Sequence, residues 1–313
     1  MRKIYLLILM SFFLHNCKEN TDLKPNYSDF ENDLEQRNLY GKVKELEQYK
    51  AIFQNGEDTR DPLLNLREKF TEFGSLNKAE YFDNYGKITQ IDHFYYDDNH
   101  FLKKSISENN LANQKTVQLI SYDSIKKTTT RNITFNDSLN YKFISTFDSN
   151  DLIAKQIKIE AKDTVVRSYE YKFNDDNKKT LEKEFEEGKE LSIGTYKYDK
   201  ENQLIEYSNK EEWMELLTQT EWKNNRIFKQ TDYTISADLK KYLDRITEYD
   251  RQFNPVNIKI YENSELNREL EYDYEFDQFG NWIKRTVSMK EHFANSNKFI
   301  PIYIESREIK YWE

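Results

Sequence analysis

The residues best suited to chemistry lie in one short stretch, where Asp92-His93 is followed by Asp97, Asp98 and His100. Carboxylates and imidazoles can hold a divalent cation together, provided that the chain folds them around one point. Each residue also has a local structural use, because Asp97 can cap a turn, His100 can take a left-handed backbone position and His93 can lie on a strand. We favour this structural interpretation and predict no metal ligand, cofactor or catalytic residue.

Motifs for other chemistry are lacking. The sequence has no Gly-x-Ser-x-Gly elbow, no Gly-rich phosphate loop, no His-Glu-x-x-His and no second cysteine. Acidic pairs such as Asp175-Asp176 lie at predicted turns, where solvated charge is a simpler explanation than acid–base catalysis. The net charge of −9 disfavours nucleic acid, which requires a concentrated basic face. The sequence therefore predicts a non-enzymatic protein with no nucleic-acid partner.

The N-terminus is typical of an export signal. Arg2 and Lys3 precede an apolar run of eleven residues, which is too short to span a bilayer as a helix. The run ends in Leu-His-Asn-Cys at 14–17, which resembles the lipobox of bacterial lipoproteins and contains the only cysteine. The resemblance implies that residues 1–16 are a signal peptide and that Cys17 carries a lipid anchor. We predict an exported outer-membrane lipoprotein, at the periplasmic face or the cell surface, with a flexible polar tether over 17–38.

The rest of the chain is organised by a repeated phrase, an aromatic residue followed by a position that we call the anchor. The anchors recur every 24 to 27 residues, and all eight follow an aromatic side chain. Self-similarity at such a period indicates a repeat architecture. The anchors are Asp97, Asp123, Asp148, Asn174, Asp199, Lys223, Asp250 and Asp277.

The anchor phrase carries the chemistry of a tight turn. The best copies are Asp83-Asn84-Tyr85-Gly86 and Asp277-Gln278-Phe279-Gly280. Asp can bond the backbone two residues on, and Gly supplies a positive φ without steric strain. The residues that replace this Gly elsewhere include His100, Asp151, Asn177 and Asn202. We predict a type I turn closed by a bulge, made tighter after Trp222 and one residue longer at 253–255.

Strands flank these turns. Tyr169, Tyr171 and Phe173 alternate with Glu170 and Lys172, and this period of two is typical of a half-buried strand. A second polar break about thirteen residues past each anchor divides every repeat into two strands, which gives roughly twenty strands in all. We predict one all-β domain over 39–313, a long antiparallel meander of hairpin repeats that forms a curved, twisted sheet. Whether this sheet closes stays open.

The anchor phrase resembles the YD-repeat (Rhs-type) family. Phe82-Asp83, Tyr198-Asp199, Tyr249-Asp250 and Phe276-Asp277 carry the resemblance, which extends over roughly residues 70–290. Members of that family wind hairpins into a spiral sheet that encloses a toxin in the largest cases. This chain has a longer period and keeps Gly in few copies, so the resemblance implies a hairpin-repeat sheet and does not imply toxin delivery.

Three functional hypotheses follow. The first is a membrane-anchored, non-enzymatic module whose aromatic strands and tryptophans 213, 222, 282 and 312 bind a protein or glycan. The second, drawn from the resemblance, is an immunity-type lipoprotein that neutralises a toxin. The third is a hydrolase or metal-binding protein that uses His93, His100 and nearby acids. The triplets at 123–125, 137–139 and 163–165 also resemble an acceptor for O-glycosylation in some bacteria.

Overall fold

The fold is the all-β antiparallel meander that the sequence predicts. A computed structural model describes residues 33–54, 57–58, 61–160, 163–292 and 298–313. Within these residues the sheet has 21 strands, and one short helix, α1 (Asp33–Gln36), precedes it. The strands are β1 (Val43–Gln54), β2 (Glu57–Asp58), β3 (Leu63–Phe70), β4 (Leu76–Phe82), β5 (Ile88–Tyr96), β6 (Leu102–Asn109), β7 (Gln114–Asp123), β8 (Thr128–Phe135), β9 (Ser138–Phe147), β10 (Ile153–Glu160), β11 (Asp163–Phe173), β12 (Lys179–Glu186), β13 (Lys189–Tyr198), β14 (Leu204–Glu211), β15 (Met214–Lys223), β16 (Arg226–Ser236), β17 (Lys241–Tyr249), β18 (Pro255–Glu262), β19 (Glu265–Phe276), β20 (Trp282–Glu291) and β21 (Ile300–Tyr311).

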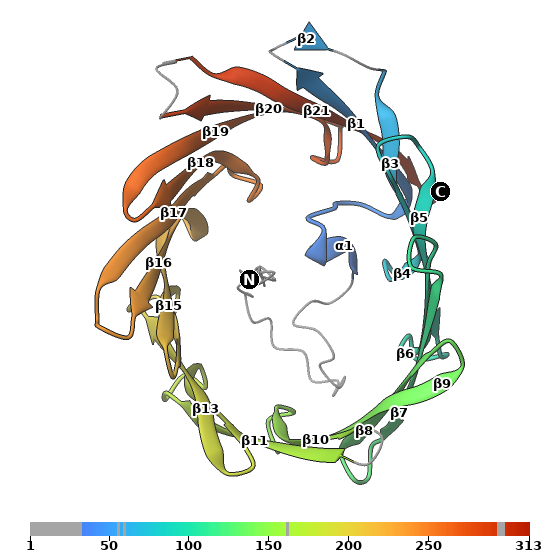
Figure 1. Cartoon of the computed structure of the whole chain (residues 1–313), viewed down its shortest axis with the longest axis vertical. Coiled ribbons are helices and arrows are strands. Elements are labelled where there is room, and N and C mark those ends of the chain that lie inside the picture. Colours follow the sequence, from blue (N-terminus) through green and yellow to red (C-terminus); the bar gives the residue numbers. More distant parts are fainter. Residues whose placement is uncertain (1–32, 55–56, 59–60, 161–162, 293–297) are drawn as a thin grey trace.

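The sheet closes on itself (Figure 1). From β3 to β21, each strand pairs antiparallel with the next, and β1 joins the two ends of this series. β1 pairs with β21 from Val43↔Tyr311 to Ile52↔Tyr303, and with β3 from Glu45↔Lys69 to Lys50↔Leu63. The two-residue β2 pairs with the end of β1 and lies outside the ring. Closure satisfies the edges that an open meander would leave unpaired.

Successive turns alternate between two rims of this ring. The rim that we call the anchor rim carries the turns after β5, β7 and every second strand up to β19, and it therefore holds all eight anchors. Asp83–Gly86 follows β4, so this turn lies on the opposite rim, the far rim, although its residues match those at Asp277. Several far-rim turns have two consecutive left-handed residues, as at Asn136-Asp137 and Asn263-Ser264, which is the type I′ hairpin geometry.

Most anchors form one kind of four-residue turn. The anchor oxygen accepts hydrogen bonds from the backbone N–H groups two and four residues further on, and the residue three further on has a positive φ, between 57° and 90°. The turns of this kind begin at Asp83, Asp97, Asp148, Asn174, Asp199, Asp250 and Asp277. After Trp222 the turn is tighter, with Asn224 and Asn225 both left-handed.

The longer turn expected at 253–255 is wrong. Phe253 itself takes the left-handed position, with φ 64°, and the turn that begins at Asp250 has the ordinary length. The Phe253 ring stacks on Tyr249 with centroids 4.4 Å apart and planes 12° apart. This aromatic contact offsets the strain that a bulky residue meets at positive φ.

An aromatic hydrogen bond links neighbouring repeats. A side chain near the end of one strand donates to the carbonyl of the first residue of the preceding strand, at 2.7 to 2.9 Å. The pairs are Tyr96 with Leu76, Tyr171 with Ile153, Tyr198 with Lys179, Trp222 with Leu204, and Tyr274 with Pro255. Each bond ties the end of an anchor-bearing strand to the previous anchor-rim turn. The donor is the aromatic residue of the phrase itself in three repeats, at Tyr96, Tyr198 and Trp222, and lies two residues earlier in the other two.

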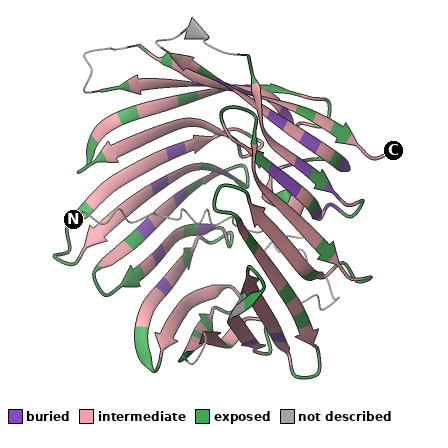
Figure 2. Ribbon diagram, turned by 45° about the vertical axis from the view of Figure 1, so that its right-hand side comes forward, coloured by how far each residue is buried: buried purple, intermediate pink, exposed green. Residues whose placement is uncertain are grey.

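Among the described residues, the dense apolar core lies on one arc of the ring. Buried residues gather where α1 meets the inner face, in a cluster of Leu34, Leu39, Val43, Leu46, Phe70, Leu76 and Ala79. On the other arcs most strand residues are half-buried (Figure 2), and all eight residues of β12 fall in this class. A strand with one packed face and one solvated face would alternate instead. Over β12 the described chain therefore leaves both faces of the sheet partly accessible.

The segment 33–41, which we call the strap, lies inside the ring (Figure 1). Its residues 33–38 were expected to end the flexible tether, but 33–36 form α1, and Leu34 and Leu39 are buried. These two leucines explain the difference, because their burial offsets the entropy of ordering a polar segment. The predicted signal peptide, Cys17 and the rest of the tether lie outside the described residues. No helix in the described ranges is long and apolar enough to cross a membrane.

Candidate binding site on the inner wall

The face that points into the ring is fixed by the strap. Leu46 packs in the cluster with Leu34 and lies opposite Ile309 on one side and Glu68 on the other. Residues directly opposite one another share a face, and alternate residues along a strand return to it. The inner face of β21 therefore carries Tyr303, Glu305, Arg307, Ile309 and Tyr311. Following the pairs round the ring places Arg285, Tyr274, Thr247, Thr218, Tyr207 and Tyr196 on this inner wall.

The strap is held to this wall by polar contacts at both ends. Asp33 Oδ2 accepts from Leu76 N at 2.6 Å, and Arg37 Nε donates to Glu68 Oε1 at 2.7 Å. Beyond the helix, Asn38 Nδ2 donates to the Gln252 carbonyl at 2.6 Å. The strap thus joins the β3–β4 side of the ring to the anchor turns that follow β17 and β19.

Asn281 is the centre of the second attachment. This side chain is only 1% exposed, and it pairs with both the N–H and the carbonyl of Tyr40, at 2.6 and 2.9 Å. Its Nδ2 also donates to the Tyr311 hydroxyl, which in turn donates to Asp277 Oδ2. Hydrogen bonds from Tyr311 and from the backbone outweigh burial and lower the pKa of Asp277. Asn281 therefore holds the strap through its backbone rather than through the Tyr40 side chain.

A charged patch lies on the inner wall next to the strap. Arg307 Cζ lies 3.4 Å from the centroid of the Trp282 ring, and Arg285 Cζ lies 4.6 Å from it. Arg285 Nε donates to Glu305 Oε2 at 2.5 Å, and Lys50 Nζ lies 3.9 Å from Glu305 Oε1. Burial lowers the pKa of Arg285, but the Glu305 carboxylate outweighs this effect and raises it. We call Lys50, Trp282, Arg285, Glu305 and Arg307 the cationic patch.

A second group of side chains lies on the wall of β11 to β14. Tyr196 and Tyr207 have ring centroids 4.9 Å apart, and the Tyr196 hydroxyl donates to Glu182 Oε2 at 3.0 Å. Lys179 lies over the Tyr196 ring at 4.7 Å and pairs with Glu182 at 2.7 Å. Burial, and next the Glu182 charge, raise the pKa of Tyr207 to about 12. This group combines flat rings with both signs of charge.

The histidine stretch does not form one site. Asp92 and His93 are adjacent on β5 and so point to opposite faces, with Asp92 on the inner side and His93 on the outer side. His100 lies in the Asp97 turn, where its ring packs on Phe73 with centroids 3.6 Å apart. Asp98 occupies the same exposed turn. In the described part of the chain, no three His, Cys, Asp or Glu side chains gather in a way that could hold a metal ion.

The four tryptophans do not share a surface. Trp213 is 65% exposed at a far-rim turn, whereas Trp282 is 6% exposed on the inner wall. Trp222 is committed to the hydrogen bond with Leu204, and Trp312 lies under Lys44 Nζ at 4.6 Å. A common stacking platform of these four residues, which the sequence allowed, is therefore wrong.

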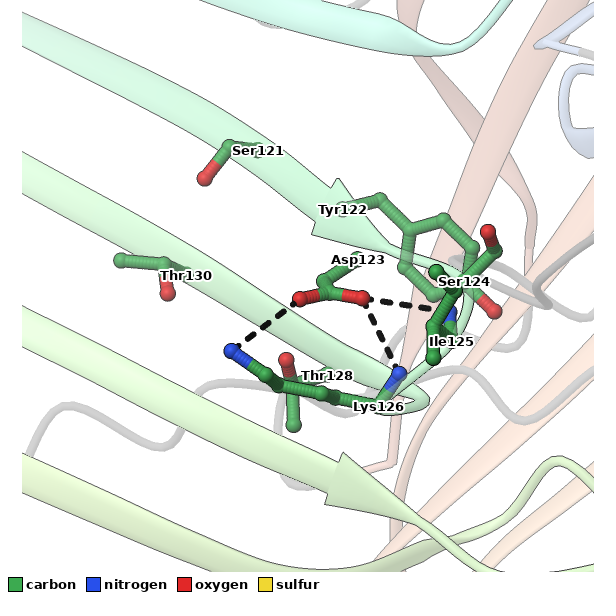
Figure 3. Close-up of a pocket in the computed structure, with 8 residues that line it drawn as sticks. All are labelled: Ser121, Tyr122, Asp123, Ser124, Ile125, Lys126, Thr128 and Thr130. Atoms are coloured by element: carbon green, nitrogen blue, oxygen red, sulfur yellow. Dashed lines mark hydrogen bonds and ion pairs between the residues drawn. The ribbon is translucent and has the colours of Figure 1, made fainter.

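The Asp123 turn departs from the others and borders a shallow hollow of about 600 Å³ (Figure 3). Asp123 Oδ1 accepts from Ile125 N at 3.1 Å and Lys126 N at 3.0 Å, and Lys126 Nζ lies 3.5 Å from Oδ2. These contacts lower the pKa of Asp123, the backbone bond from Lys126 most of all. Ser124 and Ile125 are exposed at the tip. With its carboxylate engaged in the turn, Asp123 has a structural role.

Sequence reasoning missed Asn281, Arg285 and Arg307. For Asn281 a signal existed, because the residue that follows the left-handed turn position is Asn in only two repeats, at 254 and 281. These are the two turns that the strap contacts. The two arginines carry no such signal, since charged residues alternate with aromatics in most strands.

No family model matches the chain, and no curated protein matches it. Among solved structures, a porin-like protein from Bacteroides uniformis ATCC 8492 is similar at 12% identity, covering 86% of this chain and 98% of that chain, with a TM-score of 0.35. A porin-like protein from Bacteroides vulgatus ATCC 8482 has 8% identity over the same shares and a TM-score of 0.27. The TcdB2-TccC3-Cdc42 structure has 10% identity, covers 75% of this chain and 16% of that chain, and has a TM-score of 0.31. These values are too low to assign the chain to any of these proteins.

Proposed function

We propose that this protein is an exported, lipid-anchored, non-enzymatic module that binds a protein or glycan on its inner wall. The observation that carries the proposal is the strap, because the inner wall already holds a stretch of polypeptide through backbone bonds and leucine burial. Away from the strap, the same wall is half-buried and presents tyrosines beside charged groups. Such amphipathic rings are enriched where proteins bind partners.

The lipid anchor at Cys17 and the YD-like repeats belong to the same proposal. A diacylated Cys17 would hold the ring close to a membrane, since two acyl chains anchor stably where one does not. A toxin would be one protein ligand among others, so the immunity hypothesis becomes a special case of binding on this wall. The metal-dependent alternative loses its support from geometry, because His93 and His100 lie apart.

The test compares an inner-wall variant with a matched outer-face variant of the full-length protein in detergent. Tyr196→Ser with Tyr207→Ser removes the inner ring pair, and His93→Ser with Tyr95→Ser removes an outer pair whose centroids lie 6.4 Å apart. Binding is measured on a glycan array and by capture from envelope extract. We expect the inner variant to lose at least about tenfold in affinity, as the loss of two stacking rings should give, and the outer variant to bind normally. Equal binding by both variants and the wild type would place the ligand elsewhere and refute the proposal.

A further inference from the structure

The cationic patch holds more positive than negative charge. Lys50, Arg285 and Arg307 surround a single carboxylate, Glu305. The other nearby acid, Glu68, is 4% exposed and is already paired with Arg37 of the strap at 2.7 Å. The chain as a whole carries a net charge of −9, so a local excess of cations on its inner wall is unexpected. Like charges held together on a partly desolvated wall repel each other unless an anion balances them.

Arg307 is the cation of the patch that forms no ion pair with a carboxylate among the described residues, although the Glu68 and Glu305 charges act on it from further away. Its Nε donates to Gln48 Oε1 at 3.0 Å, and its guanidinium stacks on Trp282, but its Nη1 is buried with no hydrogen-bond partner. Burial, and next the Arg285 charge, lower the pKa of Arg307 to about 9. A buried donor on a charged group is destabilising when it has no acceptor. The chain therefore keeps this arginine at the expense of stability, as proteins often do at binding sites.

We propose that the cationic patch is a binding site for an oxyanion, a carboxylate, sulfate or phosphate group. The proposal rests on the proposed function and deepens it, since it names the chemistry of one group on the ligand. Arg307 and Arg285 present planar forks of donors that suit the oxygens of such a group. Lys50 adds a third cation, and the half-buried Tyr303 lies beneath its Nζ at 3.9 Å.

The site is open enough to be reached from the inside of the ring. The side chains of Lys50 and Arg285 are 33% and 25% exposed, and Arg307 is half-buried, although its Nη1 is buried. Glu305 is bound to Arg285 and occupies part of the cationic surface, so the incoming oxyanion binds beside it and engages Lys50 and Arg307. Cations in a partly enclosed wall also attract an anion before contact, which steers acidic ligands inward.

The experiment is calorimetric titration of the full-length protein in detergent with sulfate, phosphate and glucuronate at constant ionic strength. We expect each anion to bind the wild type and Arg307→Met to bind at least about tenfold more weakly, because a charge-assisted hydrogen bond is lost. Arg67→Met is the matched control, since Arg67 lies on the outer face between Glu47 and Glu80. It should bind all three anions as the wild type does.

Stability separates a binding role from a structural one. Met replaces a buried and partly unpaired cation by an apolar side chain of similar length, so the unfolding midpoint of Arg307→Met should stay the same or rise. A large fall in that midpoint, or anion binding that Arg307→Met leaves unchanged, would overturn the inference. Lys50→Gln is an independent test of the same site: it removes a cation from a loose 3.9 Å pair and is expected to bind the anions several-fold more weakly.

Two further outcomes identify the source of the oxyanion and distinguish failure of this site from failure of the proposed function. A uronate-containing oligosaccharide that binds more tightly than free glucuronate would assign the group to a glycan, whereas equal affinities would assign it to a small anion. Absence of binding by all these probes would refute the oxyanion site. The proposed function would then still stand if the Tyr196 and Tyr207 double variant lost its envelope ligand.

Discussion

The side-chain amide of Asn281 and the backbone of Tyr40 form two reciprocal hydrogen bonds across 241 residues of sequence. Asn281 acts here as a strand edge would, with one donor and one acceptor aligned on the backbone N–H and carbonyl of a single residue. The bond joins the strap to the turn that begins at Asp277, which the sequence identifies as a repeat anchor. Through this contact, the strap covers Asn281, which lies in the hairpin loop and is only 1% exposed.

We first predict that Asn281→Ala destabilises the protein by about 2–4 kcal/mol, because it removes both bonds to the backbone N–H and carbonyl of Tyr40 at a part-buried site. Urea unfolding measures the change. Asn267→Ala is the control, since its amide bonds to Glu262 at an exposed site, and it should alter stability by less than about 0.5 kcal/mol. Similar losses for the two variants would mean that the strap contact contributes little.

The second prediction compares two turns of the same chemistry. Gly86 and Gly280 have φ values of 75° and 90°, but a Cβ on Gly86 meets nothing within 4 Å, whereas one on Gly280 would lie 2.7 Å from Gln252 Nε2. Asn tolerates the left-handed region, so Gly86→Asn should be nearly neutral. Gly280→Asn displaces Gln252 from the Gly280 carbonyl, a 3.1 Å bond, and should cost about 1–2 kcal/mol more.

Hydrogen exchange of the backbone amides shows where in the chain each Asn variant loses protection. Loss of protection for Gly280→Asn should centre on the turns at 250–254 and 277–281. Val at either position forces a β-branched residue to positive φ and should cost about 1–3 kcal/mol. Identical stabilities for the two Asn variants would show that the contact with Gln252 does not matter.

The third prediction tests the bond between repeats. Tyr274→Phe removes the hydroxyl that donates to the Pro255 carbonyl at 2.9 Å, and we expect a loss of about 1 kcal/mol. Tyr272→Phe alters the same face of the same strand, two residues away, and should cost clearly less. Chemical denaturation gives both values, and the reverse order would show that the aromatic residue acts by packing alone.

Fourth, we predict steep loss of structure in alkaline solution. Burial raises the pKa values of Tyr207, Tyr249 and Tyr272 to about 12, against 10 in the unfolded chain. A raised pKa in the folded state stabilises the protein fully below pH 10, and this stability is lost as the pH rises toward 12. Circular dichroism, followed with the absorbance of tyrosinate, should show both transitions together.

Replacing these three tyrosines with Phe should make stability less dependent on pH over the same range. Tyr85→Phe serves as the control, because Tyr85 is 83% exposed at the tip of a turn. If ionisation of the tyrosines preceded unfolding by a wide margin, the inner-wall tyrosines would be more accessible than the structure indicates.

The fifth prediction concerns the membrane anchor. Cys17→Ala should move the protein from the membrane fraction to the soluble fraction, because a diacyl group at this position is the anchor that we propose. Cell fractionation with metabolic labelling by a fatty acid measures the change, and Lys18→Ala is a control that should stay anchored. Firm membrane retention of Cys17→Ala would exclude lipidation as the anchor.

Much of the fold could be predicted because its repeat unit is local. An anchor such as Asp97 or Asp199 bonds to backbone groups two and four residues away, so the turn is encoded within five residues. His100, Asp151, Asn177 and Asn202 hold positive φ values where the sequence places them. The strands could be predicted for the same reason, because the alternation of aromatic and charged residues is also a local pattern. The Phe253 turn was mispredicted because Phe is a residue type that disfavours positive φ, and its stacking on Tyr249, four residues earlier, is not implied by the turn residues themselves.

Closure of the ring and the site on its inner wall depend on contacts that no short pattern contains. β1 meets β21 through pairs such as Leu46↔Ile309, and this meeting depends on the summed twist of every strand between them. Ring closure also brings Lys50 of β1 beside Arg285 and Arg307 of β20 and β21. Asp83 and Asp277, with equal turn chemistry, lie on opposite rims because one follows β4 and the other β19 in the alternating series of strands. The sequence by itself determined the hairpins, because their bonds are local, whereas only the tertiary structure decided what they enclose, because small rotations add up over the whole chain.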